Sequence, residues 1–392
     1  MSTRQRTRPA LPQRPERLFL KVISGLYREW PLLMNMTTTA LFLGFGPGWL
    51  ADLSNSLWFA FILMWLFTVI LLSAFAVVRH AENLADRLGE PLGTLILTLA
   101  VTGIEVMMIA AVMYAGHGNS ALARDAMFAV VMIVLNGMVG LSLLLGGLRY
   151  HEQTYNLQGA NAFLAVIVPL AALGLVLPNY TVSSPGPTFS TPQATFLIVM
   201  SLGLYGVFLA IQNLRHRDYF VAPRPVESVD GQRAEGHGDH KVRPVAYHLP
   251  LLLAYLLPLV ILSKQLAVPI NYGIRVLDAP PALGGFLVAV LILAPESLGA
   301  ARAALANQLQ RSVNILLGSV LATISLTIPA VLTIGFITGQ TIILGLDAVD
   351  TILLLLTLGV STLTFASART NVLLGAVHLL LFLAYLMLIF EK

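Results

Sequence analysis

Two apolar stretches of this chain share one pattern: LGTLILTLAVTGIE at residues 92–105 and LGGFLVAVLILAPE at residues 283–296. In each, a Leu-Gly pair is followed, 12 positions after the glycine, by a single glutamate, Glu105 or Glu296. An ionised carboxylate inside a membrane helix is costly and is a functional hypothesis by default. Two such residues at matched positions predict an ion site built by an internal repeat.

The composition predicts an all-α polytopic membrane protein. The chain is 57% hydrophobic and 11% charged, whereas a soluble domain is about 25% charged. Apolar runs of about 20 residues, enough to cross a lipid bilayer, recur from Pro31 to Phe390. The absence of cysteine excludes disulfides and thiolate chemistry, and no cofactor is expected.

Counting apolar segments between charge clusters predicts about 11 transmembrane helices. Their limits are 31–51, 55–78, 92–115, 125–148, 160–178, 194–213, 247–267, 281–301, 312–336, 341–363 and 370–390.

Charge asymmetry predicts the orientation, because cytoplasmic loops are rich in Lys and Arg. The tail at 1–30 is basic and lacks a cleavable signal pattern, so we expect a retained cytoplasmic N-terminus. The loop at 179–193 carries no charge and is expected outside, as is the C-terminus. This favours a bacterial inner-membrane protein, and without clustered aromatic residues the tail does not indicate nucleic-acid binding.

The polar stretch 214–246 is basic and contains Gly and Pro, which predicts a flexible cytoplasmic linker. It separates an extra first span (31–51) and a five-helix repeat (55–213) from a second five-helix repeat (247–390). Because five is odd, the second repeat would be inverted relative to the first, as in many secondary transporters.

The inverted arrangement would bring the two glutamates together. Twelve helical residues rise about 18 Å, and the hydrocarbon layer is about 30 Å thick. Glu105 and Glu296, entering from opposite sides, are therefore expected near the same midplane.

Several neighbours could support such a site. Thr98 and Thr102 share a helical face with Glu105, and Gly103 loosens the backbone beside it. Pro295, which removes a helical hydrogen bond, is expected to break the helix before Glu296 and free carbonyls as ligands. The remaining polar candidates, which serve helix packing equally well, are Ser297, Asn314, Ser319, Thr323 and Asn136.

Three features have plainer readings. The linker residues Glu235, His237, Asp239 and His240 could bind a metal, but a solvated segment is the more favoured interpretation. Asp347 and Asp350 would attract cations at an entrance or simply mark the membrane edge. The two glutamates themselves could be protonated structural carboxyls.

The chain resembles the ChaA-type calcium/proton antiporters of the Ca²⁺/cation antiporter superfamily. The resemblance rests on GEPLGTLILTLAVTGIEV, SLLLGG and APESLGAARAALANQLQRSVNILLGSVLATISLTIP, and extends from about residue 30 to the end. It implies that the family's central acidic residues fall on Glu105 and Glu296, and that the Gly-Ser of the family's second repeat helix falls on Gly318-Ser319. The superfamily's usual Gly-Asn-x-x-Glu is absent from both stretches, so its amide ligands are not carried over.

These observations predict a secondary antiporter, and not an enzyme, that exports Ca²⁺ in exchange for H⁺. The alternative is Na⁺/H⁺ or K⁺/H⁺ exchange on the same scaffold. An intramembrane hydrolase would need a nucleophile–base pair at depth, and His378 has no acidic motif beside it. A passive channel would need repeated pore helices.

Overall fold

The computed structural model describes residues 29–89, 92–115, 121–223 and 244–391, without the side chains of 92–95, 97–98 and 111–115. The basic tail before Glu29 lies outside these residues, and so do the four linker candidates Glu235, His237, Asp239 and His240.

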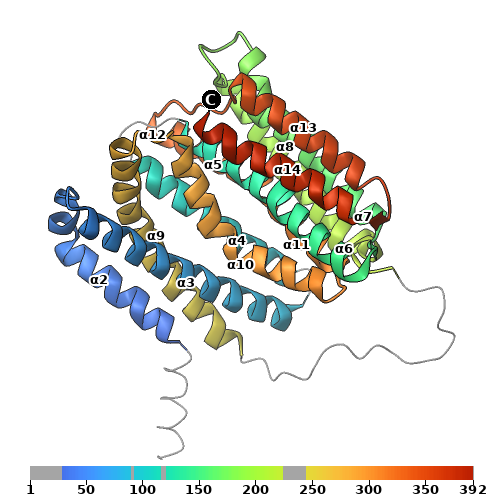
Figure 1. The fold of residues 1–392 in the computed structure, drawn as a ribbon, viewed down its shortest axis with the longest axis horizontal. Helices are drawn as coiled ribbons and strands as arrows, with labels where there is room; N and C mark the ends of the chain where they lie inside the picture. The colour runs from blue at the N-terminus through green and yellow to red at the C-terminus, as the bar shows by residue number, and fades with distance from the viewer. Residues whose placement is uncertain (1–28, 90–91, 116–120, 224–243, 392) are drawn as a thin grey trace, which may run out of the picture.

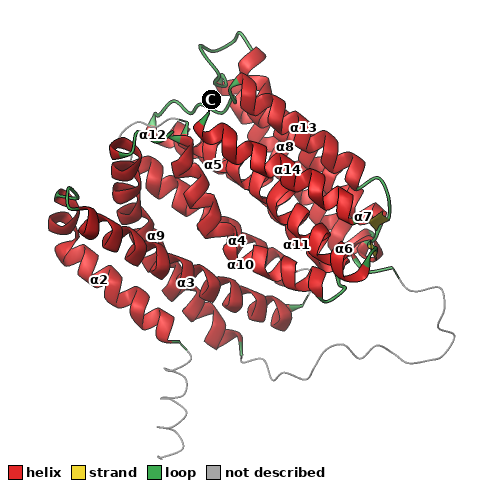
Figure 2. Ribbon diagram, in the orientation of Figure 1, coloured by secondary structure: helices red, strands yellow, loops and turns green. Residues whose placement is uncertain are grey.

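Helices make up most of the first half (Figures 1 and 2). They are α2 (Trp30–Ala51), α3 (Ser56–Leu88), α4 (Leu92–Ala115), α5 (Leu122–Val131), η1 (Met132–Met138), α6 (Val139–Tyr150), α7 (Leu157–Ala171), η2 (Ala172–Val176), η3 (Leu177–Tyr180), α8 (Thr191–Ala210), η4 (Ile211–Arg215) and η5 (Arg217–Phe220).

The second half is built in the same way. It contains α9 (Val245–Val276), α10 (Ala282–Leu305), α11 (Leu309–Ala322), η6 (Thr323–Thr327), α12 (Ile328–Thr338), α13 (Ala348–Thr364) and α14 (Val372–Phe390). The short strands β1 (Gln153–Thr154) and β2 (Arg369–Thr370) pair antiparallel.

An all-helical membrane protein is confirmed. Within the described residues, 8 helical segments are long and apolar enough to cross a bilayer, and two shorter apolar helices, Leu99–Ala110 and α13, accompany them. Each predicted apolar segment coincides with a helix, while the count of eleven crossings stays a prediction.

Some predicted limits were wrong. Helix α3 does not stop at residue 78 but continues to Leu88, because Ala81, Leu84 and Ala85 keep an apolar face on its last turns. The predicted span 341–363 begins later, since residues 340–347 form a loop and α13 starts only at Ala348.

The acidic helices α4 and α10 lie in the middle of the molecule. Figure 1 shows α2, α3 and α9 on one side of them, and the group of α5, α6, α8, α13 and α14 on the other. Helix α4 packs against α3 and α9, whereas α10 packs against α5, α6 and α11. At Gly285 helices α10 and α5 pack so closely that an added Cβ would lie 2.8 Å from the backbone nitrogen of Ala126.

Loops from the two halves meet at each end of the bundle. At one end β1 pairs with β2, and at the other the amide of Leu344 donates to the carbonyl of Pro187 (3.2 Å). The start of α2 and the end of α14 lie at opposite ends (Figure 1). This placement is the one expected for an odd number of crossings.

The irregular turns are not where the sequence suggested. Helix α4 runs unbroken through Gly103, and α10 runs unbroken through Pro295. A proline removes only one hydrogen bond from the ladder, and the packed neighbours of α10 hold the helix together around it. The π-helical turns η1 and η6 lie instead in the segments that follow α4 and α10: η1 joins α5 to α6, and η6 joins α11 to α12. Their first residues, Met132 and Thr323, stand at the same interval from Glu105 and Glu296.

Candidate ion-binding site

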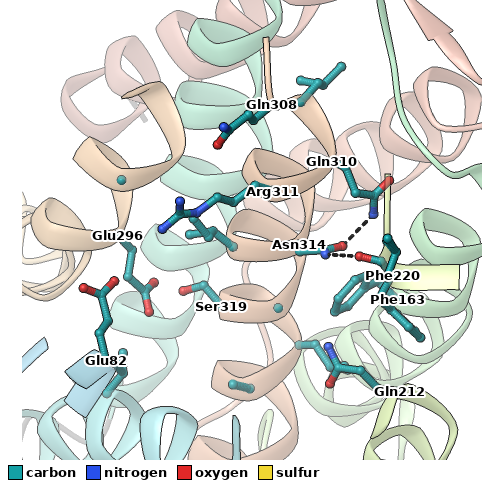
Figure 3. A pocket seen from close by; sticks show the side chains of 18 of the residues that line it. Glu82, Phe163, Gln212, Phe220, Glu296, Gln308, Gln310, Arg311, Asn314 and Ser319 are labelled. Carbon is teal, nitrogen blue, oxygen red and sulfur yellow. Dashed lines mark hydrogen bonds between the residues drawn. The ribbon is translucent and has the colours of Figure 1, made fainter. Parts of the chain in front are cut away.

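A cavity of about 870 Å³ separates the two sides of the molecule and contains both predicted glutamates in its lining. Its walls come from α3, α4, α10 and α11, with contributions from α7, α8 and the loop after η5. Figure 3 shows the side chains that face it.

Glu105 lines this cavity and is only 3% exposed. The hydroxyl of Thr323 donates a hydrogen bond of 2.7 Å to its Oε2 atom. Its Oε1 atom has no hydrogen-bond partner among the described residues. Because Thr323 opens η6, the π-helical turn sets the position of this hydroxyl, as such turns often do at functional sites.

Glu296 is half-buried and faces the same cavity from α10. The hydroxyl of Ser319, on α11, points toward its carboxylate (Figure 3). Its Oε2 atom is buried and also lacks a hydrogen-bond partner in the described part of the chain. The two glutamates therefore have the same condition: one oxygen each that the protein leaves unsatisfied.

The threonine and serine candidates separate into two groups. Thr102, Ser319 and Thr323 line the cavity with the glutamates. Ser297, although next to Glu296, is not part of the lining, and the side chain of Thr98 lies outside the described residues.

The two asparagine candidates are already hydrogen-bonded. Asn314 lines the cavity, but its amide nitrogen donates to the carbonyl of Phe220 (2.7 Å) and its oxygen accepts from Gln310 (2.8 Å) (Figure 3). Asn136 lies elsewhere, donating to Thr357 (2.8 Å) and contacting His378 (3.3 Å). Asn314 therefore shapes the wall, and Asn136 belongs to a separate polar cluster.

The aspartates of the predicted entrance form a helix cap. The side chain of Asp347 accepts from the backbone amide of Asp350 (2.9 Å) and begins α13. This helix-capping contact agrees with the interpretation that Asp347 and Asp350 mark the membrane edge at the start of α13.

Sequence reasoning missed two charged residues of the cavity. Glu82, on the extended end of α3, faces Glu296, and Arg311 extends toward both carboxylates from α11 (Figure 3). Arg311 lies just before the predicted span 312–336, and Glu82 lies beyond the end of the predicted span 55–78. The apolar periodicity that continues to residue 88 is the signal that could have found Glu82.

The cavity opens toward the end of the bundle where the linker begins. Ala222 and Pro223, which lie within the predicted linker and are the last residues described before position 224, line it together with Asn307 and Gln308. Phe220 anchors this segment by packing against Phe163 and Phe208. Charge asymmetry predicts this end to be cytoplasmic.

This arrangement suits a small hard cation or protons. Carboxylate and hydroxyl oxygens are the ligands that such cations prefer. In the described residues, no group of three or more His, Asp or Glu side chains is arranged around one metal position. Ligands beyond the two carboxylates would therefore be hydroxyls, backbone carbonyls or water.

Comparison with known proteins places the chain among exchangers. The profile of the sodium/calcium exchanger protein family matches it in two segments, residues 58–214 and 248–391. The sodium-potassium/proton antiporter ChaA of Escherichia coli is 44% identical over 321 residues, covering 82% of this chain and 86% of its own length. A putative ionic transporter, y4hA of Sinorhizobium fredii, is 43% identical, covering 81% and 85%.

Solved structures share the fold. Native YfkE superimposes with a TM-score of 0.68 at 17% identity, covering 92% of this chain and 100% of that one. The H⁺/Ca²⁺ exchanger CAX gives 0.60 at 15% identity, covering 92% and 88%. The chain therefore belongs to the sodium/calcium exchanger protein family, as a multi-pass membrane transporter of cations and not an enzyme.

Proposed function

We propose that the chain is a cation/proton antiporter of the bacterial inner membrane, which exports Ca²⁺ in exchange for H⁺ through Glu105 and Glu296. The observation that carries this proposal is the pair of unsatisfied carboxylate oxygens facing one cavity. A buried polar group without a partner is costly, and a charged one more so. A bound cation or a proton relieves that cost, so the two compete for the same oxygens.

Exchange follows from this competition. A divalent cation neutralises both glutamates at once, and when it leaves, the pair must take up protons or stay charged in a low dielectric. If the empty, charged form cannot change between its inward and outward states, cation movement in one direction requires proton movement in the other. A carboxyl that was only structural would instead have its oxygens satisfied by the protein.

Charge favours Ca²⁺ as the cation, because two carboxylates match one divalent ion. The fold is also that of proteins whose names include H⁺/Ca²⁺ exchange. The second candidate is Na⁺ or K⁺ against H⁺, which the name of the 44% identical relative favours. A monovalent ion would neutralise one glutamate and leave the other protonated.

The proposal includes the predicted architecture of one extra span (31–51) and two inverted five-helix repeats, 55–213 and 247–390. The family profile matching in two segments supports it, as do the matched intervals from Glu105 to η1 and from Glu296 to η6. With the N-terminus cytoplasmic and the C-terminus outside, the cavity opens inward.

The supporting oxygens come from Thr323, Ser319 and Thr102, the polar candidates that face the cavity. Thr323 holds the Glu105 carboxylate by its hydrogen bond. Ser319 does the same from the side of Glu296. Hydroxyls suit this role, because they can donate to a carboxylate and offer a lone pair to a cation.

The test is cation-driven proton movement in everted membrane vesicles, with Ca²⁺, Na⁺ and K⁺ supplied in turn. We expect Ca²⁺ addition to release protons from the acidified interior of vesicles that contain the wild-type protein. Vesicles that contain Glu105→Gln or Glu296→Gln should release none. Cation flux that is independent of the pH gradient would indicate a channel and overturn the proposal. Proton release with Na⁺ or K⁺ but not with Ca²⁺ would establish the second candidate.

A further inference from the structure

A third carboxylate stands between the site and the open end of the cavity. Glu82 lies on the last turns of α3, is exposed, and lines the cavity together with Glu296. Figure 3 shows the two carboxylates pointing toward one another from different helices. Glu82 is exposed, Glu296 half-buried and Glu105 buried, so the three acidic residues lead from solvent toward the buried part of the cavity lining.

Arg311 places a positive charge beside this path. Its guanidinium extends from α11 toward Glu82 and Glu296 (Figure 3), and its charge acts on Glu82. Among the described residues Arg311 and Glu82 do not form an ion pair, so the guanidinium attracts the Glu82 carboxylate without holding it in place. Such a carboxylate attracts a cation and can still release it.

We infer that Glu82 recruits the transported cation at the open end of the cavity and passes it to Glu296, while Arg311 limits how tightly Glu82 holds it. This inference rests on the proposed function and deepens it. A cavity whose walls carry a net negative charge raises the local concentration of cations, and here three carboxylates outnumber the one guanidinium. Glu82 would therefore govern how readily the cation enters, and not how the exchange is coupled.

The expected size of the effect depends on the charge of the cation. The local concentration of an ion depends exponentially on the product of its charge and the electrostatic potential in the cavity. In a water-filled cavity one nearby charge changes the energy of a monovalent ion by somewhat less than about 1 kcal/mol. We therefore expect Glu82→Gln to raise the KM of a monovalent ion about threefold. The same loss of potential raises the KM of a divalent ion about ninefold. Vmax should stay at its wild-type value.

The experiment measures KM and Vmax in everted and in right-side-out vesicles, so that the cation is presented from each face. Asp86→Asn is the matched control, since Asp86 lies one turn further along α3, is exposed, and does not line the cavity. Glu82→Gln should raise KM from the cavity side only, and Arg311→Gln should lower it. Asp86→Asn should change KM far less than either, because Asp86 acts on Glu82 from outside the cavity lining. Added choline chloride should shrink both effects, because salt screens exposed charges.

Three results would overturn the inference: an unchanged KM for Glu82→Gln, an equal rise from both faces, or a loss of Vmax. The last would place Glu82 in the central site and not before it. Glu296→Gln, measured beside these variants, separates this inference from the proposed function. If Glu296→Gln transports normally the proposed function fails, and if it is inactive while Glu82→Gln is unaltered only the recruiting role fails.

Discussion

Two groups of buried carboxylates in this protein are treated in opposite ways. Glu29, at the start of α2, accepts hydrogen bonds from Tyr247 and Tyr255 (3.1 Å each) and pairs with Arg79 (2.6 Å). Glu105 and Glu296, in the middle of their helices, each keep one oxygen without a partner in the described chain. The first carboxylate joins helices to one another, and we propose that the other two bind a ligand.

The surroundings of Glu29 explain its role. Its Oε2 atom also meets the ring of His80 (3.2 Å), which in turn contacts His248 (3.0 Å). Burial would raise the pKa of Glu29, but the hydrogen bond with His80 and the charge of Arg79 outweigh it and hold the pKa below its ordinary value. The group ties α2, α3 and α9 together as a clasp. In the described part of the chain, no comparable hydrogen-bond network surrounds Glu105 and Glu296.

The largest contrast is expected from removing the charge in each region. Glu105→Gln and Glu296→Gln should each lower exchange at least about 100-fold, because the neutral amide can neither pair with the cation nor exchange a proton. Both proteins should insert and purify as the wild type does. Glu29→Gln should keep most of its exchange activity. Normal proton-coupled transport by Glu105→Gln or Glu296→Gln would contradict the proposed difference between these glutamates and Glu29.

The pH dependence of cation affinity sharpens it further. Under the proposal that protons and the cation share the two glutamates, apparent cation affinity should rise with pH where the pair is protonated. The limit is about two decades per pH unit for a divalent ion displacing two protons, and about one for a monovalent ion displacing one. Titrating cation binding to detergent-solubilised protein between pH 6 and 9 measures this slope. A flat profile, with binding still dependent on both glutamates, would rule out competition there.

The supporting hydroxyl should matter less than the carboxylates. Thr323→Val removes the donor to Glu105 while keeping the shape of the side chain, and we expect about a tenfold loss of cation affinity, the size of one charge-assisted hydrogen bond. Thr323→Ser restores the hydroxyl and should recover most of the affinity. Equal affinities for the valine and serine variants would mean that Thr323 only packs.

In the clasp, the expected effect is on stability. Glu29→Gln leaves Arg79 and His80 without their anion, at a cost of about 1–3 kcal/mol, which should lower the melting temperature by a few degrees. The matched control is Glu152→Gln, whose ion pair with Arg369 is exposed (3.4 Å) and should contribute nothing measurable.

The difference between wild type and Glu29→Gln should also depend on pH. A folded-state pKa below the unfolded value stabilises the protein above that unfolded value, near 4.5, and the benefit is lost as pH falls through the folded pKa. The two melting temperatures should therefore converge in acid. A difference that persists well below pH 4 would contradict the assignment.

The smallest effect is expected from the linker. Its basic, Gly-containing sequence joins the two halves without supplying either glutamate, so replacing residues 225–240 with a neutral flexible segment should leave exchange unchanged. Transport and insertion are both measured. A loss of transport in a protein that inserts normally would assign the linker a direct role.

The sequence by itself determined the class of the protein and pointed to the two residues at the centre of the proposed site. Apolar length decides membrane insertion one segment at a time, and a lone glutamate in an apolar run is visible without any tertiary contact. The match between residues 92–105 and 283–296 is likewise a property of the linear chain. The sequence also suggested the hydroxyls of Thr323 and Ser319, because they recur along one helical face.

Only the tertiary structure decided which candidates meet. Asn136 and Asn314 are both asparagines in apolar segments of the sequence. In the structure Asn136 is hydrogen-bonded to Thr357, away from the cavity, whereas Asn314 lines the cavity and donates to the carbonyl of Phe220. Glu82 faces Glu296 only because α3 extends past its predicted end, and Glu29 is satisfied only because α3 and α9 approach it. Hydrogen bonds and charge pairs act over a few ångströms between segments far apart in the chain, so no local pattern can assign a carboxylate to a clasp or to a ligand.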